Sequence, residues 1–265
     1  LTLRREMLIF VTSFFRDPKA FQTLYDKVIT PMVADADSGD TLRAWTAGVA
    51  TGEEAYTIAM LFIEAFEEQR RWLNLKIFAT DADPQCIEKA SAGQYPESAA
   101  AELSAERLGR FFVKKKSGYE VKSELRQCIV FARHNLLSDP PFTRMDIVAC
   151  RNTLIYFRPG AQERALRSLQ FAVKEGGALL LGSSESLSTA TDGLKAVSVR
   201  HKIFRRIGPT APPLTNSRAS LPLPRGTGGP VAVPAPRRLS ESAVLADAGI
   251  AALLERFAPP AMIVN

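Results

Sequence analysis

A strand, a turn of small residues and a long helix follow one another between residues 42 and 68. The strand is predicted at 42–47, the turn reads AGVATG at 47–52, and a helix with an apolar stripe is predicted at 53–68. Small residues let backbone N–H groups approach a ligand at the carboxyl edge of a parallel sheet, where open α/β folds bind cofactors. The segment therefore predicts an α/β fold with a cofactor site behind one of its strands.

Strands and helices keep alternating along the chain. Further strands are predicted at 76–80, 128–132, 145–150 and 178–181, and further helices at 84–92 and 161–173. This series is typical of a mainly parallel sheet with helices on both faces. Alternating apolar and polar residues at 195–206 predict an antiparallel hairpin at the sheet edge. The less regular stretch at about 94–127, with a helix near 103–112, is interpreted as a small insertion.

The composition changes after residue 207. Eight of the 17 prolines lie between Pro209 and Pro236, among glycines and serines, so we expect residues 208–239 to form a flexible linker. An amphipathic helix and the start of a strand are predicted within 240–265. We expect one folded domain at 41–207, preceded by a partly helical segment at 1–40.

Charge and residue counts exclude several classes of protein. The 34 basic and 28 acidic residues leave a net charge of +6, and Lys114–Lys116 is the one dense basic cluster, so no nucleic-acid partner is predicted. The three cysteines are 42 and 22 residues apart and there are two histidines, a pattern that predicts no metal site. No apolar run approaches the roughly 20 residues that cross a bilayer, so we expect a cytoplasmic protein without membrane insertion.

The residues after the turn restrict the ligand. Glu53 and Glu54 place negative charge where a pyrophosphate would lie, and no lysine follows as in a P-loop. Only Gly48 and Gly52 are glycine, whereas the fingerprint of nicotinamide-dependent dehydrogenases needs a third. A ligand with a cationic centre fits this turn better than a phosphate.

Three polar residues follow later strands. Asp81 ends KIFATD, where a carboxylate can accept hydrogen bonds from both hydroxyls of a ribose. Its alternative role, capping the next helix, suits Asp83 better. Asn135 and Asn152, 17 residues apart, each follow a strand, and each alone is equally well a turn residue. Placed on two adjacent strand ends, they would form a pocket.

Five segments resemble the CheR-type chemotaxis receptor methyltransferases, which transfer methyl from S-adenosylmethionine to receptor glutamates. They read VTSFFRD, WTAGVATGEEAYTIAM, FATDAD, FARHNLLSDPPF and CRNTLIYF, and the similarity covers roughly residues 8–207. The resemblance implies a Rossmann-like class I methyltransferase fold. The proline-rich stretch and the tail LLERFAPPAMIVN further resemble hybrid proteins in which a CheB-type methylesterase precedes this domain and a PAS sensor follows it.

The resemblance also implies roles for individual residues. Thr12 and Arg16 would close over the cofactor, with Gly48 in the binding turn. Glu54 would face the methionine or sulfonium region, and Asp81 the ribose. The adenine side is assigned to Asn135 and Leu136, and the methionyl part to Asn152 and Thr153. Phe10 stands where some members carry an asparagine, which removes one polar contact.

The acceptor would be oriented by polar groups near the strand ends. Arg43, Arg133, Arg151 and Tyr156 are candidates, and Arg16 and Tyr156 are favoured as the catalytic pair, while His134 is interpreted as structural. A glutamate with a pKa near 4.3 is about 99% ionised at pH 7, so no general base is required.

The expected function is that of a protein-glutamate O-methyltransferase. It would use S-adenosylmethionine, release S-adenosylhomocysteine and need no metal. Its partner would be the cytoplasmic domain of a methyl-accepting receptor or another glutamate-bearing signalling protein. The alternative is a module that binds the cofactor and signals through a PAS-like tail without transferring methyl. In the family, N-terminal helices that engage the receptor, mostly missing here, and the insertion, which docks a receptor tail in some members, govern acceptor choice.

Overall fold

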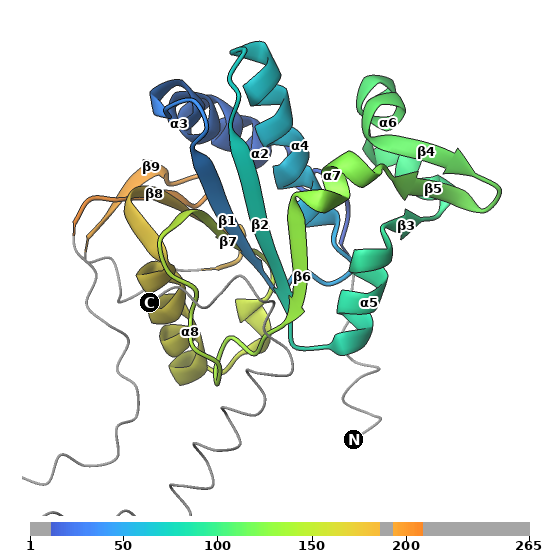
Figure 1. Ribbon diagram of the computed structural model, residues 1–265. Helices are drawn as coiled ribbons and strands as arrows, with labels where there is room; N and C mark the ends of the chain where they lie inside the picture. The colour runs from blue at the N-terminus through green and yellow to red at the C-terminus, as the bar shows by residue number, and fades with distance from the viewer. Residues whose placement is uncertain (1–11, 186–192, 209–265) are drawn as a thin grey trace, which may run out of the picture. The chain divides into compact units, whose positions relative to one another are not determined.

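Seven strands of the described chain pair into one sheet (Figure 1). The computed structural model describes residues 12–185 and 193–208. The strand order is β6-β2-β1-β7-β8-β10-β9, parallel from β6 to β8, with β10 antiparallel to both β8 and β9. The strands are β1 Thr41–Ala47, β2 Asn74–Asp81, β6 Ile129–Arg133, β7 Met145–Cys150, β8 Val173–Leu181, β9 Leu194–Ser198 and β10 Ile203–Arg206. The predicted mainly parallel sheet with an antiparallel edge hairpin is confirmed.

Helices connect the strands. They are α2 Pro18–Leu24, α3 Thr30–Asp35, α4 Glu53–Glu68, α5 Pro84–Ala92, α6 Ala105–Phe111, α7 Ser123–Gln127 and α8 Pro159–Ala172. A π-helical turn, η1 Tyr25–Ile29, joins α2 to α3, and two 3-10 turns are η2 Glu97–Glu102 and η3 Leu154–Tyr156. The bounds of α4 and α5 are the predicted ones. Helix α8 begins two residues before its predicted start, because Pro159 occupies the first turn, where its missing N–H costs nothing.

Alternation along the strands produces two hydrophobic cores. Ala44 of β1 and Ile147 of β7 belong to the core under α4, whereas the next residues, Trp45 and Val148, belong to the core under α8. Successive side chains of a strand point to opposite faces, so a sheet covered on both faces needs apolar residues at every position. The continuous apolar character of β7, which is buried at all six positions, follows from this arrangement.

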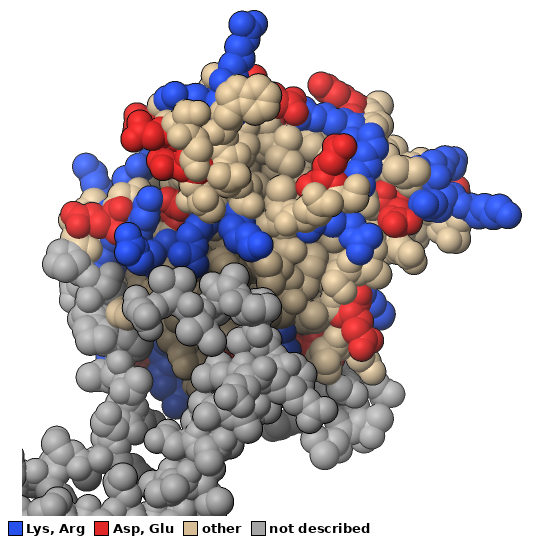
Figure 2. Space-filling model, viewed as in Figure 1, with Lys and Arg blue, Asp and Glu red and all other residues tan. Residues whose placement is uncertain are grey.

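A second, small sheet stands beside the main one (Figure 1). Its order is β3-β5-β4, all antiparallel, with β3 Gln94–Tyr95, β4 Phe112–Lys115 and β5 Gly118–Val121. It occupies the stretch interpreted as an insertion. Lys and Arg side chains gather at the tip of this sheet (Figure 2). Two of the lysines there have acidic neighbours, since Lys114 lies 3.7 Å from Glu97 and Lys115 3.2 Å from Glu120.

Parts of the sequence predictions fall on residues that are not described. The linker at 208–239, the PAS-like segment at 240–265 and the helical start of the chain at 1–11 lie outside the described residues, apart from Gly208. Within the described ranges, each helix is too short or too polar to cross a bilayer.

Candidate functional site

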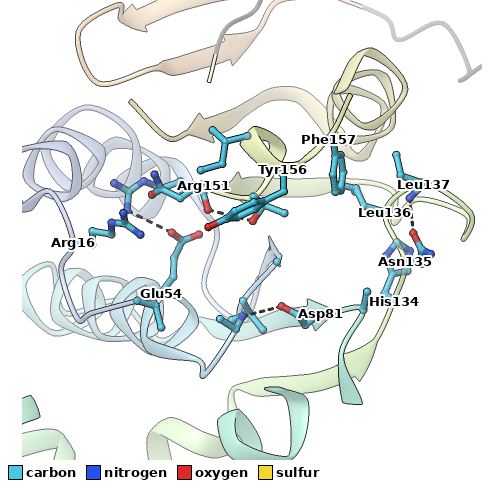
Figure 3. A pocket seen from close by; sticks show the side chains of 18 of the residues that line it. Arg16, Glu54, Asp81, His134, Asn135, Leu136, Leu137, Arg151, Tyr156 and Phe157 are labelled. Carbon is cyan, nitrogen blue, oxygen red and sulfur yellow. Dashed lines mark hydrogen bonds and ion pairs between the residues drawn. The ribbon is translucent and has the colours of Figure 1, made fainter. Parts of the chain in front are cut away.

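A cavity of about 620 Å³ opens at the carboxyl ends of the parallel strands (Figure 3). Its volume is in the range of small-molecule sites. Every residue that the sequence assigns to the cofactor lines it, and so do the acceptor candidates Arg151 and Tyr156. The cofactor residues are Thr12, Arg16, Gly48, Glu54, Asp81, Asn135, Leu136, Asn152 and Thr153. They come from segments that lie far apart in the chain and meet because parallel strands end at the same edge of the sheet.

The turn after β1 approaches its neighbours closely. Gly48 has φ +74°, and a Cβ at this position would lie 2.1 Å from Thr153 Oγ1, so only glycine fits. The N–H groups of Gly48 and Val49 both donate to the carbonyl oxygen of Thr80, at 2.8 and 3.0 Å. Ala50 also has a left-handed backbone, with φ 47°, a strain that is common where a ligand is bound.

Asp81, the last residue of β2, is held by the backbone on both sides. Its Oδ2 accepts from the N–H of Ala50 at 3.0 Å and its Oδ1 from the N–H of Asp83 at 2.9 Å. Two further lone pairs of the carboxylate remain for a ligand in the cavity. Asp83 caps α5 by accepting from the N–H of Gln85 at 2.9 Å, so the capping role falls to Asp83, as predicted.

Charged side chains gather at one end of the cavity. Figure 3 shows Arg16, Glu54, Arg151 and Tyr156 converging there, with Asp81 between them and Asn135. Arg151 Nη1 lies 3.4 Å from Glu54 Oε2, and its Nη2 lies 2.5 Å from Asp17 Oδ2. The Arg151 side chain is only 2% exposed and lies over the ring of Phe21. A single buried guanidinium therefore connects the start of α2 to the start of α4.

Burial raises the pKa of the Glu54 carboxyl above its ordinary value, and the charge of Arg151 opposes this shift. Glu185 raises the pKa further, while Arg16 lowers it. Glu53 does not line the cavity: it hydrogen-bonds Thr51 Oγ1, because successive helix residues point about 100° apart. The prediction that both acids exclude a phosphate is therefore wrong for Glu53.

The two asparagines line the same cavity from strands that are not adjacent. Asn135 follows β6 and Asn152 follows β7, with β2 and β1 between them, so the prediction of adjacent strand ends is wrong. The crossover order of a doubly wound sheet separates strands that are consecutive in sequence. Asn135 Oδ1 accepts from the N–H of Leu137 at 3.0 Å, which also makes it a turn residue. Asn152 has φ 55°.

His134 and the remaining arginines take different positions. The His134 ring lines the cavity wall and packs edge-on against Trp45, and its Nε2 is 3.0 Å from the carbonyl oxygen of Pro140. Arg43 lies in the first half of β1, away from the carboxyl edge, and Arg133 does not line the cavity, so neither is placed to orient an acceptor.

The segment before α2 is fixed by its backbone. The N–H of Phe14 donates to Glu102 Oε2 at 2.7 Å, and the N–H of Phe15 donates to Thr57 Oγ1 at 3.2 Å. The ring of Phe14 also packs edge-on against Tyr95 of the small sheet. These contacts hold Arg16 at the cavity, although the sequence alone shows none of them.

Glu185 is a buried carboxylate that was not predicted from the sequence. Its Oε1 accepts from the N–H groups of Thr153 and Leu154 at 2.9 and 3.1 Å, and its Oε2 accepts from the N–H of Gly182. It therefore positions the loop after β7 that carries Asn152 and Thr153. The sequence signal that points to it is LLLGSSE, in which a single acid follows an apolar strand after a short turn.

We expect Glu185→Gln to lower the free energy of unfolding by about 2–3 kcal/mol, because the amide NH₂ cannot accept and leaves a buried N–H unpaired. Urea unfolding at pH 7 measures the loss. The matched change Glu88→Gln, on the exposed face of α5, should stay within about 0.5 kcal/mol. Equal stability of the two variants would contradict the positioning role of Glu185.

Among the residues described, no group of three His, Cys, Asp or Glu side chains forms a candidate metal site. Cys86 and Cys150 are free and buried, and burial raises the pKa of both thiols.

Comparison with known proteins agrees with the resemblance. Residues 11–203 match the family described as CheR methyltransferase, SAM binding domain. The chain is 35% identical over 201 residues to chemotaxis protein methyltransferase 1 of Pseudomonas aeruginosa, over 74% of this chain and 73% of that protein. It is 33% identical over 182 residues to the chemotaxis protein methyltransferase of Listeria monocytogenes, over 69% of this chain and 67% of that protein.

A third relative is longer. The chain is 56% identical over 265 residues to an uncharacterised 104.1 kDa protein of Rhodobacter capsulatus, and spans 27% of that protein. The parallel sheet with its antiparallel hairpin is also the Rossmann-like arrangement that the resemblance implied. The chain belongs to the CheR methyltransferase family, and residues 11–203 are its S-adenosylmethionine-binding domain.

Proposed function

We propose that this protein transfers the methyl group of S-adenosylmethionine to glutamate side chains of a chemotaxis receptor. The observation that carries the proposal is a single cavity with two features. At one place Asp81 offers carboxylate lone pairs that the backbone does not use, and at one end Glu54, Arg16 and Arg151 meet. The first feature suits a ribose and the second a charged methionine with a carboxylate acceptor beside it.

The residues present fit this cofactor. Asp81 would hold the ribose hydroxyls, and Glu54 would face the cationic region. Asn135 and Leu136 would contact the adenine, and Asn152 would contact the methionyl part. Gly48 lies too close to Thr153 to carry a side chain, so its backbone borders the cavity without filling it. This supports the assignment of the cavity to the cofactor.

When bound, S-adenosylmethionine supplies a methyl group that a carboxylate oxygen takes as the carbon–sulfur bond breaks, leaving S-adenosylhomocysteine. The chain contributes positioning rather than proton transfer, because the acceptor is ionised at neutral pH. Arg16 and Tyr156 are the groups we assign to orienting it. Tyr156 is 54% exposed and lies where the cavity meets solvent, so an acceptor from another protein can reach it.

Arg151 is restrained in a different way. Its two terminal nitrogens pair with the carboxylates of Asp17 and Glu54. Because the side chain is also buried, these two ion pairs fix the plane of the guanidinium. We assign it to holding Glu54 in place and to contributing positive charge beside the acceptor. No metal is needed for this chemistry.

The proposed partner is the cytoplasmic domain of a methyl-accepting receptor, or another signalling protein with exposed glutamates. The relatives from P. aeruginosa and L. monocytogenes are named chemotaxis methyltransferases, which supports this choice.

The product distinguishes this activity from cofactor binding alone. With S-adenosylmethionine labelled in the methyl group and a purified receptor cytoplasmic domain, we expect label on the acceptor that mild alkali releases as methanol, because a glutamyl methyl ester is base-labile. The receptor domain with its acceptor glutamates replaced by alanine is the control and should take up none. Label that resists alkali would contradict transfer to a carboxylate, and binding without any transfer would indicate a sensing module.

A further inference from the structure

A second cavity, of about 380 Å³, lies on the other side of Arg151. Lys19, at the start of α2, and Asp17, just before it, form one wall. Ser183 after β8 and Arg200 and His201 in the turn between β9 and β10 form another.

Among the residues that the structure describes, Arg151 alone lines both cavities. Its Nη1 faces Glu54 of the first cavity, and its Nη2 faces Asp17 of the second. Its Nε is buried and has no hydrogen-bond partner among the described residues. Arg151 therefore borders both cavities and retains one unused donor.

Positive charge exceeds negative charge around the second cavity. Within the described ranges, its charged lining residues are Arg151, Lys19 and Arg200 against Asp17, and the Asp17 carboxylate is paired with Arg151. Lys19 and Arg200 are exposed, and neither has an ion pair within the described ranges. Two unpaired cations beside a paired one favour an anionic ligand.

The backbone holds Arg200 and His201 in place. The carbonyl of Lys202 accepts from the N–H of Leu181 at 3.0 Å, which ties the turn to the end of β8. The N–H of His201 donates to Ser198 Oγ at 3.3 Å. A fixed turn loses little conformational freedom when it binds a ligand.

We propose that this second cavity is an acceptor subsite, which binds a carboxylate side chain of the acceptor protein next to the glutamate that is methylated. The inference rests on the proposed function, because it assigns the first cavity to the cofactor and the acceptor to its Arg151 end. A polypeptide with two acidic side chains can place one on each side of Arg151. The subsite would select acceptors with paired acids over those with an isolated glutamate.

The test uses two synthetic, fluorescein-labelled helical peptides and the full chain loaded with S-adenosylhomocysteine. One peptide carries glutamates at positions i and i+4, which lie on the same helix face, and the other has glutamine at the second position. By fluorescence anisotropy we expect the paired peptide to bind about two- to fivefold more tightly. Lys19→Glu and Arg200→Glu should abolish that preference.

Lys195→Glu is the matched control, because Lys195 is exposed at the other end of the same hairpin and does not line the cavity. It should keep the preference, and all three variants should bind S-adenosylhomocysteine with unchanged affinity by calorimetry. The subsite is disproved if the wild-type protein binds both peptides equally or if the preference survives in Arg200→Glu.

A transfer assay on the same peptides separates the two proposals. Methyl transfer whose KM for the paired peptide is the same in wild type and Arg200→Glu would leave the proposed function standing and overturn the subsite. Loss of the binding preference in the variants without any transfer by wild type would contradict the proposed function and reduce the second cavity to a binding site for paired acids.

Discussion

Asp81→Ala is expected to weaken S-adenosylhomocysteine binding by at least about 100-fold while the protein stays folded. Hydrogen bonds to a charged group contribute about 1.5–3 kcal/mol each, and two ribose hydroxyls would lose their acceptor together. The carboxylate is already oriented by the N–H groups of Ala50 and Asp83, so its loss also releases the turn after β1. Titration calorimetry measures the affinity.

Asp83→Ala is the control for this change. Asp83 lies two residues further along and does not line the cavity, but its carboxylate caps α5. We expect that variant to lose about 1 kcal/mol of stability and to keep its affinity. Circular dichroism checks that both variants are folded. Unchanged affinity in Asp81→Ala would remove this residue from the site.

The part of the site that the sequence predicts is the part built by local geometry. Gly48 directly follows β1 and Asp81 ends β2, and in a parallel sheet strand ends share one edge, so their meeting follows from the order of elements. The same reasoning locates Asn135 and Asn152 at that edge. It does not give their separation, because the crossover that inserts β2 and β1 between their strands has no local signature.

The charged end of the cavity depends on contacts that no sequence window contains. Arg151 is 134 residues from Asp17 and 97 from Glu54, and Glu185 bonds backbone groups 32 residues before it. Spacing indicates that Arg151 follows a strand, but not that it is buried between two carboxylates. For the same reason Glu53 and Glu54 are equivalent in the sequence and differ only when α4 is packed.

Arg151→Met is expected to lower the free energy of unfolding by about 3–5 kcal/mol at pH 7, because it leaves Glu54 and Asp17 without their shared cation. Burial already raises the pKa of Glu54, and Arg151 is the main group that lowers it, so the substitution raises that pKa further. A folded-state pKa above the unfolded one means that the folded protein binds the proton more tightly. The deficit should therefore be largest above the raised pKa and shrink as the pH falls toward the ordinary carboxyl pKa.

Arg151→Lys separates charge from geometry. Lysine keeps a positive charge near Glu54 but cannot bridge two carboxylates as a guanidinium does, so we expect a smaller deficit with a weaker dependence on pH. Arg16 and Glu185 also shift the pKa of Glu54, but both are unchanged in the two variants. A difference between the variants therefore reports on residue 151 alone. Urea unfolding of the ligand-free protein between pH 5 and pH 8 measures both. A Met variant with the same deficit at both ends of that range would show that Arg151 acts through packing on Phe21 and not through the Glu54 charge.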